Sequence, residues 1–175
     1  KRIYSGTTTL QFGVGPAIDK GFYYDIDFGG VKVSDEDLKK IEKEMRKIIA
    51  QKQKMVYSEK SRDEALKWAE KNGQKFKTEL INDLPDDETI SFYTLGEFED
   101  LCKGPHVEDT GKVGAFKLDK VAGAYWRCDE KREMLTRIYG LAFETQEELD
   151  EYIKKQEEAK ARDHRKLGKE LDLFC

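Results

Sequence analysis

The stretch Gly21-Phe22-Tyr23-Tyr24-Asp25-Ile26-Asp27-Phe28 decides the fold class that the sequence predicts. It is rich in aromatic and β-branched residues and alternates in character, which is typical of a β-strand. Asp19-Lys20-Gly21 predicts a hairpin turn before the strand, and Gly29-Gly30 ends it. Ser34 is then the predicted N-cap of a helix that runs to about residue 53, with acidic residues in its first turn and apolar residues at helical spacing.

The rest of the chain continues this mixture of strands and helices. One helix is expected to begin at Ser61 and to stop at Asn72-Gly73, and another covers residues 76–84. Further strands are expected at residues 55–57, 90–95, 116–118, 123–127 and 134–139. Together these elements indicate an α+β fold with a mixed, largely antiparallel sheet and packed helices.

A long polar helix is predicted at the C-terminal end of the chain. Thr145 and Glu148 form a capping box, and the helix is expected to continue to about residue 172. It is mostly charged, with a thin apolar stripe made of Leu149, Ile153, Leu167 and Leu171. A helix this polar usually bridges domains or packs lightly on one side.

The composition describes a folded, charge-rich chain. Among 175 residues, 39% are charged, with 32 Lys and Arg against 36 Asp and Glu, whereas roughly 25% is usual. Nine Phe, eight Tyr and two Trp argue against disorder. No apolar stretch is long enough to span a membrane, and no signal peptide follows Lys1, so we expect no membrane partner. Three cysteines, an odd number, favour a reducing compartment, and we expect a cytoplasmic protein.

The charges are unevenly distributed along the chain. Residues 79–100 hold eight acidic residues and no basic one, whereas residues 112–137 hold seven basic residues against four acidic ones. The basic stretch is interleaved with Tyr125, Trp126 and Tyr139, a pattern that could face a phosphate backbone. The alternative interpretation is a solvated strand face.

The most reactive-looking segment runs from Asp100 to His106. Cys102 and His106 lie four residues apart, which suits half of a soft metal site or a nucleophile with its base. Two ligands do not complete a tetrahedral zinc site, and His164, Cys128 and Cys175 are isolated in sequence. A buried structural cysteine beside a turn histidine is the remaining alternative, and Asp100 could orient the imidazole.

These segments resemble bacterial-type threonyl-tRNA synthetases. Residues 15–25, GPAIDKGFYYD, and residues 100–106, DLCKGPH, are similar to two motifs of that family. Three further blocks match in the same order: GAYWR at residues 123–127, MLTRIYG at residues 134–140 and RDHRKLGK at residues 162–169. The resemblance covers essentially the whole chain and implies the fold of the second additional domain of threonyl- and alanyl-tRNA synthetases.

In that family the matching region is an editing domain that hydrolyses mischarged seryl-tRNA(Thr). The resemblance implies an editing domain at residues 1–143, truncated at its N-terminus, and a linker helix at residues 144–175. The implied partners are the acceptor end of tRNA(Thr) carrying a seryl ester and the catalytic domain of the same parent chain. ATP and zinc belong to that catalytic domain, which lies outside these residues.

The resemblance also implies roles for particular side chains. Cys102, His106, Asp100 and Lys77 match the catalytic residues of the editing pocket, while Tyr93 and Tyr24 match residues that bind substrate. Lys77 would activate water or stabilise charge. Editing in this family requires no cofactor, and zinc could bind Cys102 and His106 only with added ligands.

One part of the family pocket is missing from the sequence. The family carries a His-x-x-x-His pair just upstream of the segment that begins at Lys1, so we expect this chain alone to hydrolyse seryl-tRNA(Thr) poorly or not at all. Two alternatives remain: a deacylase domain of the alanyl type that binds zinc, and a non-catalytic module that positions tRNA.

Overall fold

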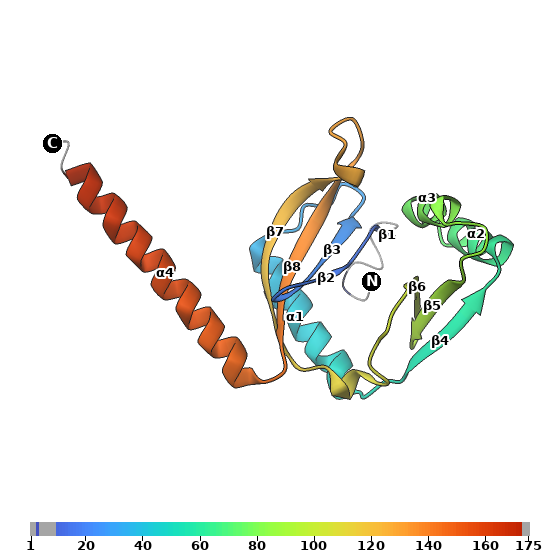
Figure 1. Ribbon diagram of the computed structural model, residues 1–175, viewed down its shortest axis with the longest axis horizontal. Coiled ribbons are helices and arrows are strands. Elements are labelled where there is room, and N and C mark those ends of the chain that lie inside the picture. Colours follow the sequence, from blue (N-terminus) through green and yellow to red (C-terminus); the bar gives the residue numbers. More distant parts are fainter. Residues whose placement is uncertain (1–2, 4–9, 173–175) are drawn as a thin grey trace.

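The computed structural model describes residue 3 and residues 10–172, with side chains as far as Arg162. It confirms an α+β fold, in which two sheets and four α-helices occupy the described part of the chain (Figure 1). Every strand pairing given for these residues is antiparallel. The strands divide into a large and a small sheet, a division that the sequence did not predict.

The large sheet has the strand order β1-β3-β8-β7, with β2 paired to β3. Its members are β1 (Gln11–Phe12), β2 (Ala17–Ile18), β3 (Gly21–Asp27), β7 (Ala115–Tyr125) and β8 (Met134–Phe143). Helix α1 (Asp35–Ala50) packs on this sheet through Leu38, which joins the apolar cluster of Phe28, Leu118 and Ile138.

The small sheet has the order β4-β5-β6. Its strands are β4 (Met55–Lys60), β5 (Ile90–Leu95) and β6 (Phe98–Leu101), and it is accompanied by α2 (Arg62–Lys71) and α3 (Lys75–Asp83). Ile90 and Phe92 pack with Ala65, Ala69 and Ile81 of these helices. On the side of the large sheet, the ring of Phe98 lies 5.3 Å from the ring of Phe12.

Helix α3 is tied to the large sheet at two places. Gln74 precedes α3, and its buried amide donates to the carbonyl of Leu10 and accepts from the backbone N–H of Phe12, at 2.8 and 2.9 Å. Phe76 of α3 is buried against Trp126 and Leu135, beside the β7–β8 connection. The helix is thus held between the two sheets.

Strand β7 differs most from its predicted form. The sequence predicted two strands at residues 116–118 and 123–127, whereas one strand runs from Ala115 to Tyr125 and short 3₁₀ helices lie at Thr110–Lys112 and Trp126–Cys128. A register shift between Leu118 and Lys120 marks a β-bulge. The bulge breaks the two-residue alternation by which a strand is recognised, so the prediction split the strand at its polar middle.

Strand β6 was not predicted. Gly96, at φ +59°, turns the chain between β5 and β6, and the short acidic segment that follows lacks a clear alternation. The predicted C-terminal ends of three other elements were approximate. Helix α1 ends at Ala50, β4 continues to Lys60 and β8 continues to Phe143. The predicted hairpin turn at residues 19–20 and the N-caps at Ser34 and Ser61 are confirmed.

Helix α4 (Gln146–Asp172) begins at the predicted capping box, in which Thr145 and Glu148 exchange hydrogen bonds. Near its start Leu149 is buried, and the ring of Tyr152 lies 5.2 Å from that of Phe143. Beyond these turns the helix extends away from both sheets (Figure 1). Among the described residues, no helix combines the length and apolar character needed to cross a membrane.

Candidate active site

The small sheet places three predicted or newly found side chains in one row. Tyr57 of β4 is the register partner of Tyr93 of β5, and Tyr93 is the register partner of Asp100 of β6. Register partners in antiparallel strands project from the same face. The row lies on the face turned towards the large sheet, because Tyr24 of β3 donates a hydrogen bond to Asp100.

Lys77 and Asp100 form a buried ion pair in this row. The Lys77 Nζ atom lies 2.9 Å from Oδ1 and 3.1 Å from Oδ2 of Asp100, and Lys77 is only 3% exposed. Its neighbour Phe76 and the later Ile81 anchor α3 in two apolar clusters, which fixes the direction of the lysine. A buried ammonium needs such a partner, because an unpaired charge inside a protein is strongly destabilising.

Tyr24 completes the lysine–carboxylate cluster, which we define as Lys77, Asp100 and Tyr24. Burial raises the pKa of Tyr24, and the neighbouring Asp100 carboxylate raises it further, so the phenol stays protonated and donates to Asp100. A Cβ atom at Gly15 would overlap the Tyr24 ring. The glycine of the GPAIDKGFYYD motif therefore leaves the space that this ring occupies.

Asp100 uses its oxygens fully. Besides Lys77 and Tyr24, it accepts from the backbone N–H of Leu101 at 2.8 Å. A carboxylate with this many donors has little capacity left to take a proton from water. The geometry is that of a residue that holds its neighbours in place.

Cys102 and His106 form a second group, the thiol–imidazole pair. The His106 Nε2 atom lies 3.0 Å from the Cys102 Sγ atom, and the His106 ring stands at 89° to the Tyr93 ring with 4.3 Å between centroids. His106 is exposed as a residue, but partial removal of its ring from water lowers its pKa below the ordinary 6.5. The imidazole is therefore neutral at pH 7 and able to accept a proton.

The loop that carries this pair is shaped closely around Tyr93. Gly104 has φ +72°, and a Cβ atom there would overlap the Tyr93 hydroxyl. Ser91 fixes the start of the loop, because its hydroxyl donates to the Cys102 carbonyl at 2.7 Å. Tyr93 thus lies between the thiol–imidazole pair and Asp100, and all six residues predicted for the site are brought together.

The described residues do not contain a set of three His, Cys, Asp or Glu side chains arranged to hold a metal ion. Cys102 and His106 would be the two zinc ligands, and Asp100 is engaged by Lys77. Cys128 is exposed in the short 3₁₀ helix after β7, while Cys175 and the side chain of His164 lie outside the described part. The residues present therefore supply half of a zinc site.

Sequence reasoning missed two contributors to this region. Tyr57 lies with its ring 5.4 Å from that of Tyr93, and Gln74 joins the start of α3 to β1. No local pattern distinguishes these residues, because their partners lie 36 to 64 positions away, and only the register and packing bring them together.

Charges from the acidic and basic stretches partly pair with each other. Glu79 accepts from Arg132 at 2.6 Å and from the Trp126 indole at 3.0 Å, and Arg127 pairs with Asp83. Lys112 and Arg137 pair with Glu108 and Asp25. Four of the seven basic residues in the stretch 112–137 are therefore engaged in ion pairs, and two of them, Arg127 and Arg132, join the β7–β8 connection to α3.

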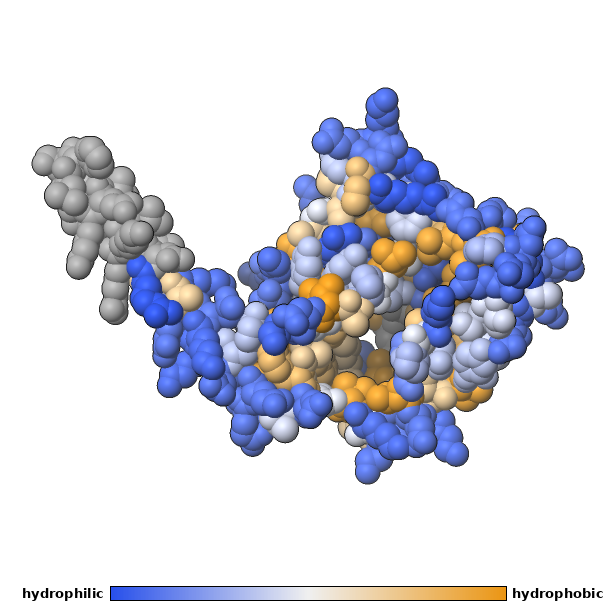
Figure 2. Space-filling view, viewed as in Figure 1, coloured by the Kyte–Doolittle hydropathy of each residue, from blue (hydrophilic) through white to orange (hydrophobic). Residues whose placement is uncertain are grey.

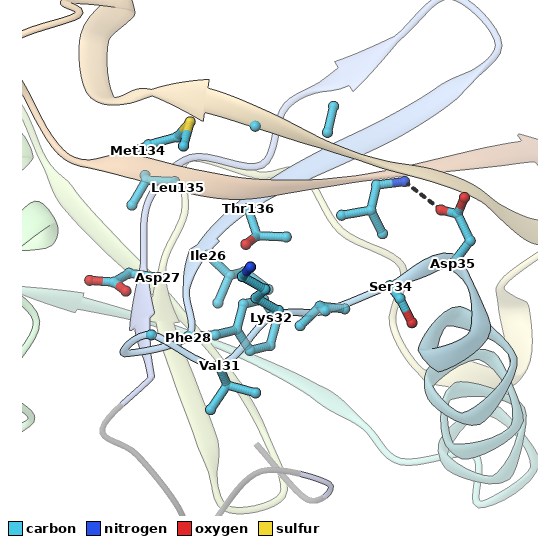
Figure 3. Close-up of a pocket in the computed structure, with 15 residues that line it drawn as sticks. Ile26, Asp27, Phe28, Val31, Lys32, Ser34, Asp35, Met134, Leu135 and Thr136 are labelled. Carbon is cyan, nitrogen blue, oxygen red and sulfur yellow. Dashed lines mark hydrogen bonds between the residues drawn. The ribbon is translucent and has the colours of Figure 1, made fainter.

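The molecular surface also contains two hollowed regions. In Figure 2 it is hollowed between the two parts that carry the large and the small sheet. A separate pocket lies between the segment after β3 and the strands β7 and β8, and its lining includes Phe28, Val31, Lys32, Asp35 and Leu135 (Figure 3). Asp35 accepts there from the backbone N–H of Val121 at 3.1 Å, so its carboxylate serves the fold. That pocket contains none of the six predicted site residues.

Comparison with known proteins identifies the setting of this cluster. The family described as "Threonyl and Alanyl tRNA synthetase second additional domain" matches residues 90–139, which include Tyr93, Asp100, Cys102 and His106. Over these residues the chain is similar to that second additional domain. The resemblance predicted from the motifs is thereby confirmed.

Curated relatives extend the match to the whole chain. The threonine–tRNA ligase of Anoxybacillus flavithermus is 56% identical over 174 residues, which is 99% of this chain and 26% of the relative. Those of Acetivibrio thermocellus and Listeria monocytogenes are 56% and 55% identical, over 99% and 100% of this chain and 27% of each relative. The chain thus spans about a quarter of the length of these ligases.

Proposed function

We propose that this second additional domain edits, hydrolysing seryl-tRNA(Thr) as part of a threonine–tRNA ligase. The observation that carries the proposal is the buried Lys77–Asp100 pair beside the Cys102–His106 pair, inside a domain of this family. An ester hydrolase needs a base for water and a positive charge near the developing oxyanion, and these two groups supply them.

We assign Lys77 the role of stabilising the developing oxyanion. Its ammonium has three N–H donors, and the two oxygens of Asp100 engage two of them, which leaves one for the substrate. Asp100 and Tyr24 are positioning residues, because they hold the ammonium in a buried place. In such surroundings a fixed donor stabilises developing charge far better than it does in water.

We assign His106 the role of general base for the attacking water. A neutral imidazole accepts a proton as the water oxygen attacks the ester carbonyl carbon, and Cys102 holds the ring in position. The bond from that carbon to the ribose oxygen then breaks. The proton passes from His106 to the ribose oxygen, and the products are serine and free tRNA.

Selection between amino acids gives this reaction a purpose. Serine lacks one methyl group of threonine, and a synthetic site discriminates by only about 1–3 kcal/mol for such a group. A pocket that admits serine and excludes the additional methyl group removes the errors that pass the first site. We accordingly assign residues 1–143 to editing and α4 to the connection with a catalytic domain.

The test is single-turnover deacylation of seryl-tRNA(Thr) and threonyl-tRNA(Thr). It uses this chain and a full-length ligase of the family in which this chain replaces the matching segment. We expect the full-length ligase to hydrolyse the serine ester and to spare the threonine ester, with this activity lost in Lys77→Met. This chain alone should hydrolyse the serine ester slowly or not at all. Equal rates with Lys77→Met, or no preference for serine, would overturn the proposal.

The same assay separates two other functions. Loss of activity after chelation and its return with zinc would indicate an alanyl-type deacylase. Salt-dependent binding of tRNA without any deacylation would indicate a module that only positions tRNA.

A further inference from the structure

Tyr57 is an exposed aromatic residue at the open end of the row that leads to Asp100. It belongs to the edge strand β4 and is 49% exposed. Its ring meets the Tyr93 ring at 67° with 5.4 Å between centroids, and Tyr93 in turn contacts His106. An unbroken aromatic row therefore leads from solvent to the thiol–imidazole pair.

The Tyr57 ring is held in place although it is exposed. Its hydroxyl donates to the Glu59 carboxylate at 2.6 Å, and Tyr93 supports one side of the ring. Aromatic rings fixed on an exposed strand are the usual platforms on which nucleic-acid bases stack, because every base has a π-face. A carboxylate beside the hydroxyl makes phosphate an unsuitable ligand for this position.

The distance from Tyr57 to the candidate active site fits the size of a nucleotide. Tyr57, Tyr93 and Asp100 lie on three consecutive strands, which places Tyr57 two strand spacings, or about 10 Å, from Asp100. A ribose ester positioned at Lys77 would bring an unpaired base of the same RNA end within reach of the Tyr57 ring.

We propose that Tyr57 is a base-stacking residue that holds the unpaired 3′ end of the RNA substrate. This inference rests on the proposed function, since it assumes an ester on an RNA end at Lys77. It adds a binding residue outside the six predicted from the sequence. Its contribution is to affinity, because Tyr57 does not reach the reacting atoms.

The test measures binding of this chain to two RNA hairpins that carry no aminoacyl ester. One hairpin ends in the unpaired 3′ nucleotides of tRNA(Thr), and the other has a blunt end. We expect Tyr57→Ala to weaken binding of the first hairpin at least about fivefold, the lower end of one base–aromatic stack, without changing binding of the second. Tyr57→Phe should retain the affinity. Val56→Ala is the matched control, because Val56 is 55% exposed on the opposite face of the same strand.

A fluorescent variant gives an independent readout. In the Tyr57→Trp variant, the hairpin with the unpaired end should quench the fluorescence of the new tryptophan, and the blunt hairpin should not. Unchanged affinity in Tyr57→Ala, or equal binding of both hairpins by the unmodified chain, would overturn the inference. Because neither hairpin carries an ester, a failure of the proposed hydrolysis would instead appear as intact binding without deacylation of seryl-tRNA(Thr).

Discussion

At the scale of the residue, Lys77 sets the energetic conditions of the site. It is a cation among apolar side chains, and Asp100 is the anion that stabilises it there. Removing one partner of a buried pair leaves an uncompensated charge, whereas removing both in favour of apolar groups is often tolerated. This asymmetry gives the pair a recognisable signature in mutants.

We therefore predict that Asp100→Asn lowers the free energy of unfolding by about 3–5 kcal/mol. The double variant Lys77→Met with Asp100→Leu should recover most of that loss. Urea denaturation followed by circular dichroism measures both. As a control, Glu88→Gln removes the exposed pair with Lys103 and should change stability by less than about 1 kcal/mol. Equal effects of the Asp100 and Glu88 substitutions would contradict the assignment.

His106 gives the site a predictable pH dependence. Its pKa in the folded chain lies below 6.5, so the neutral form that accepts a proton persists as the pH falls from 7.5 to 6.5. Deacylation rate constants should therefore fall to half of their plateau value only below pH 6.5. In the His106→Gln variant, the fall of the rate constant at low pH should disappear. A midpoint of that fall above pH 6.5 in the unmodified chain would count against His106 as the base.

The same shift has a consequence for stability. The unfolded chain takes up a proton at His106 near pH 6.5, whereas the folded chain takes it up at a lower pH. The stability contribution of neutral His106 is therefore present above pH 6.5 and is lost as the pH falls towards the folded pKa.

At the scale of the element, α3 is the part that positions the reactive lysine. Its start is joined to β1 through Gln74, and its middle is joined to the β7–β8 connection through Glu79. Donation from Trp126, and then from Arg132, lowers the pKa of Glu79, so the carboxylate is charged at neutral pH. Glu79 is about one-third exposed, and the contribution of its ion pair is reduced by solvent.

We predict that Glu79→Gln reduces the rate of deacylation through a less fixed Lys77, with binding of the RNA hairpins unchanged. A fall in kcat at constant KM is the expected pattern, measured with seryl-tRNA(Thr). Asp86→Asn removes a fully exposed partner of Arg62 and is the control. An equal change in both variants would show that α3 needs no anchor at Glu79.

The elements also show what a sequence can and cannot predict. The strand at residues 21–28 and the capped helices follow from local patterns. Cys102 and His106 are four residues apart in the sequence, and their side chains lie in contact. Tyr24 and Asp100 are 76 positions apart, so the family resemblance alone assigned both to one site, and their contact was not predicted. The bulge in β7 and the strand β6 depend on pairing with distant strands, which short-range alternation does not encode.

At the scale of the whole molecule, the site exists only while the two sheets remain together. Tyr24 comes from the large sheet and Asp100 from the small one, and Phe12 packs on Phe98 beside them. A hydrogen bond to a charged group contributes about 1.5–3 kcal/mol. The bond between Tyr24 and Asp100 is thus a joint between the sheets as well as part of the site.

We predict that Tyr24→Phe lowers stability by about 1–3 kcal/mol, because Asp100 loses a buried donor, and reduces deacylation as well. Amide hydrogen exchange should quicken at β3 and β6, the strands that carry the two partners of this bond. Tyr23→Phe is a matched control, since its ring remains beneath the Arg137 guanidinium on the other face of β3. Similar exchange rates in the two variants would show that the joint is formed by packing alone.

Helix α4 gives the proposed parent ligase a fixed internal length. Its 27 residues span about 40 Å as a continuous helix. A stiff spacer holds a tethered reactant at a defined effective concentration instead of letting it diffuse through a broad range of distances. An RNA end mischarged at one end of such a spacer would meet the Lys77 site before release into bulk solution. The timing of proofreading would then be set by a span of backbone that takes no part in the chemistry.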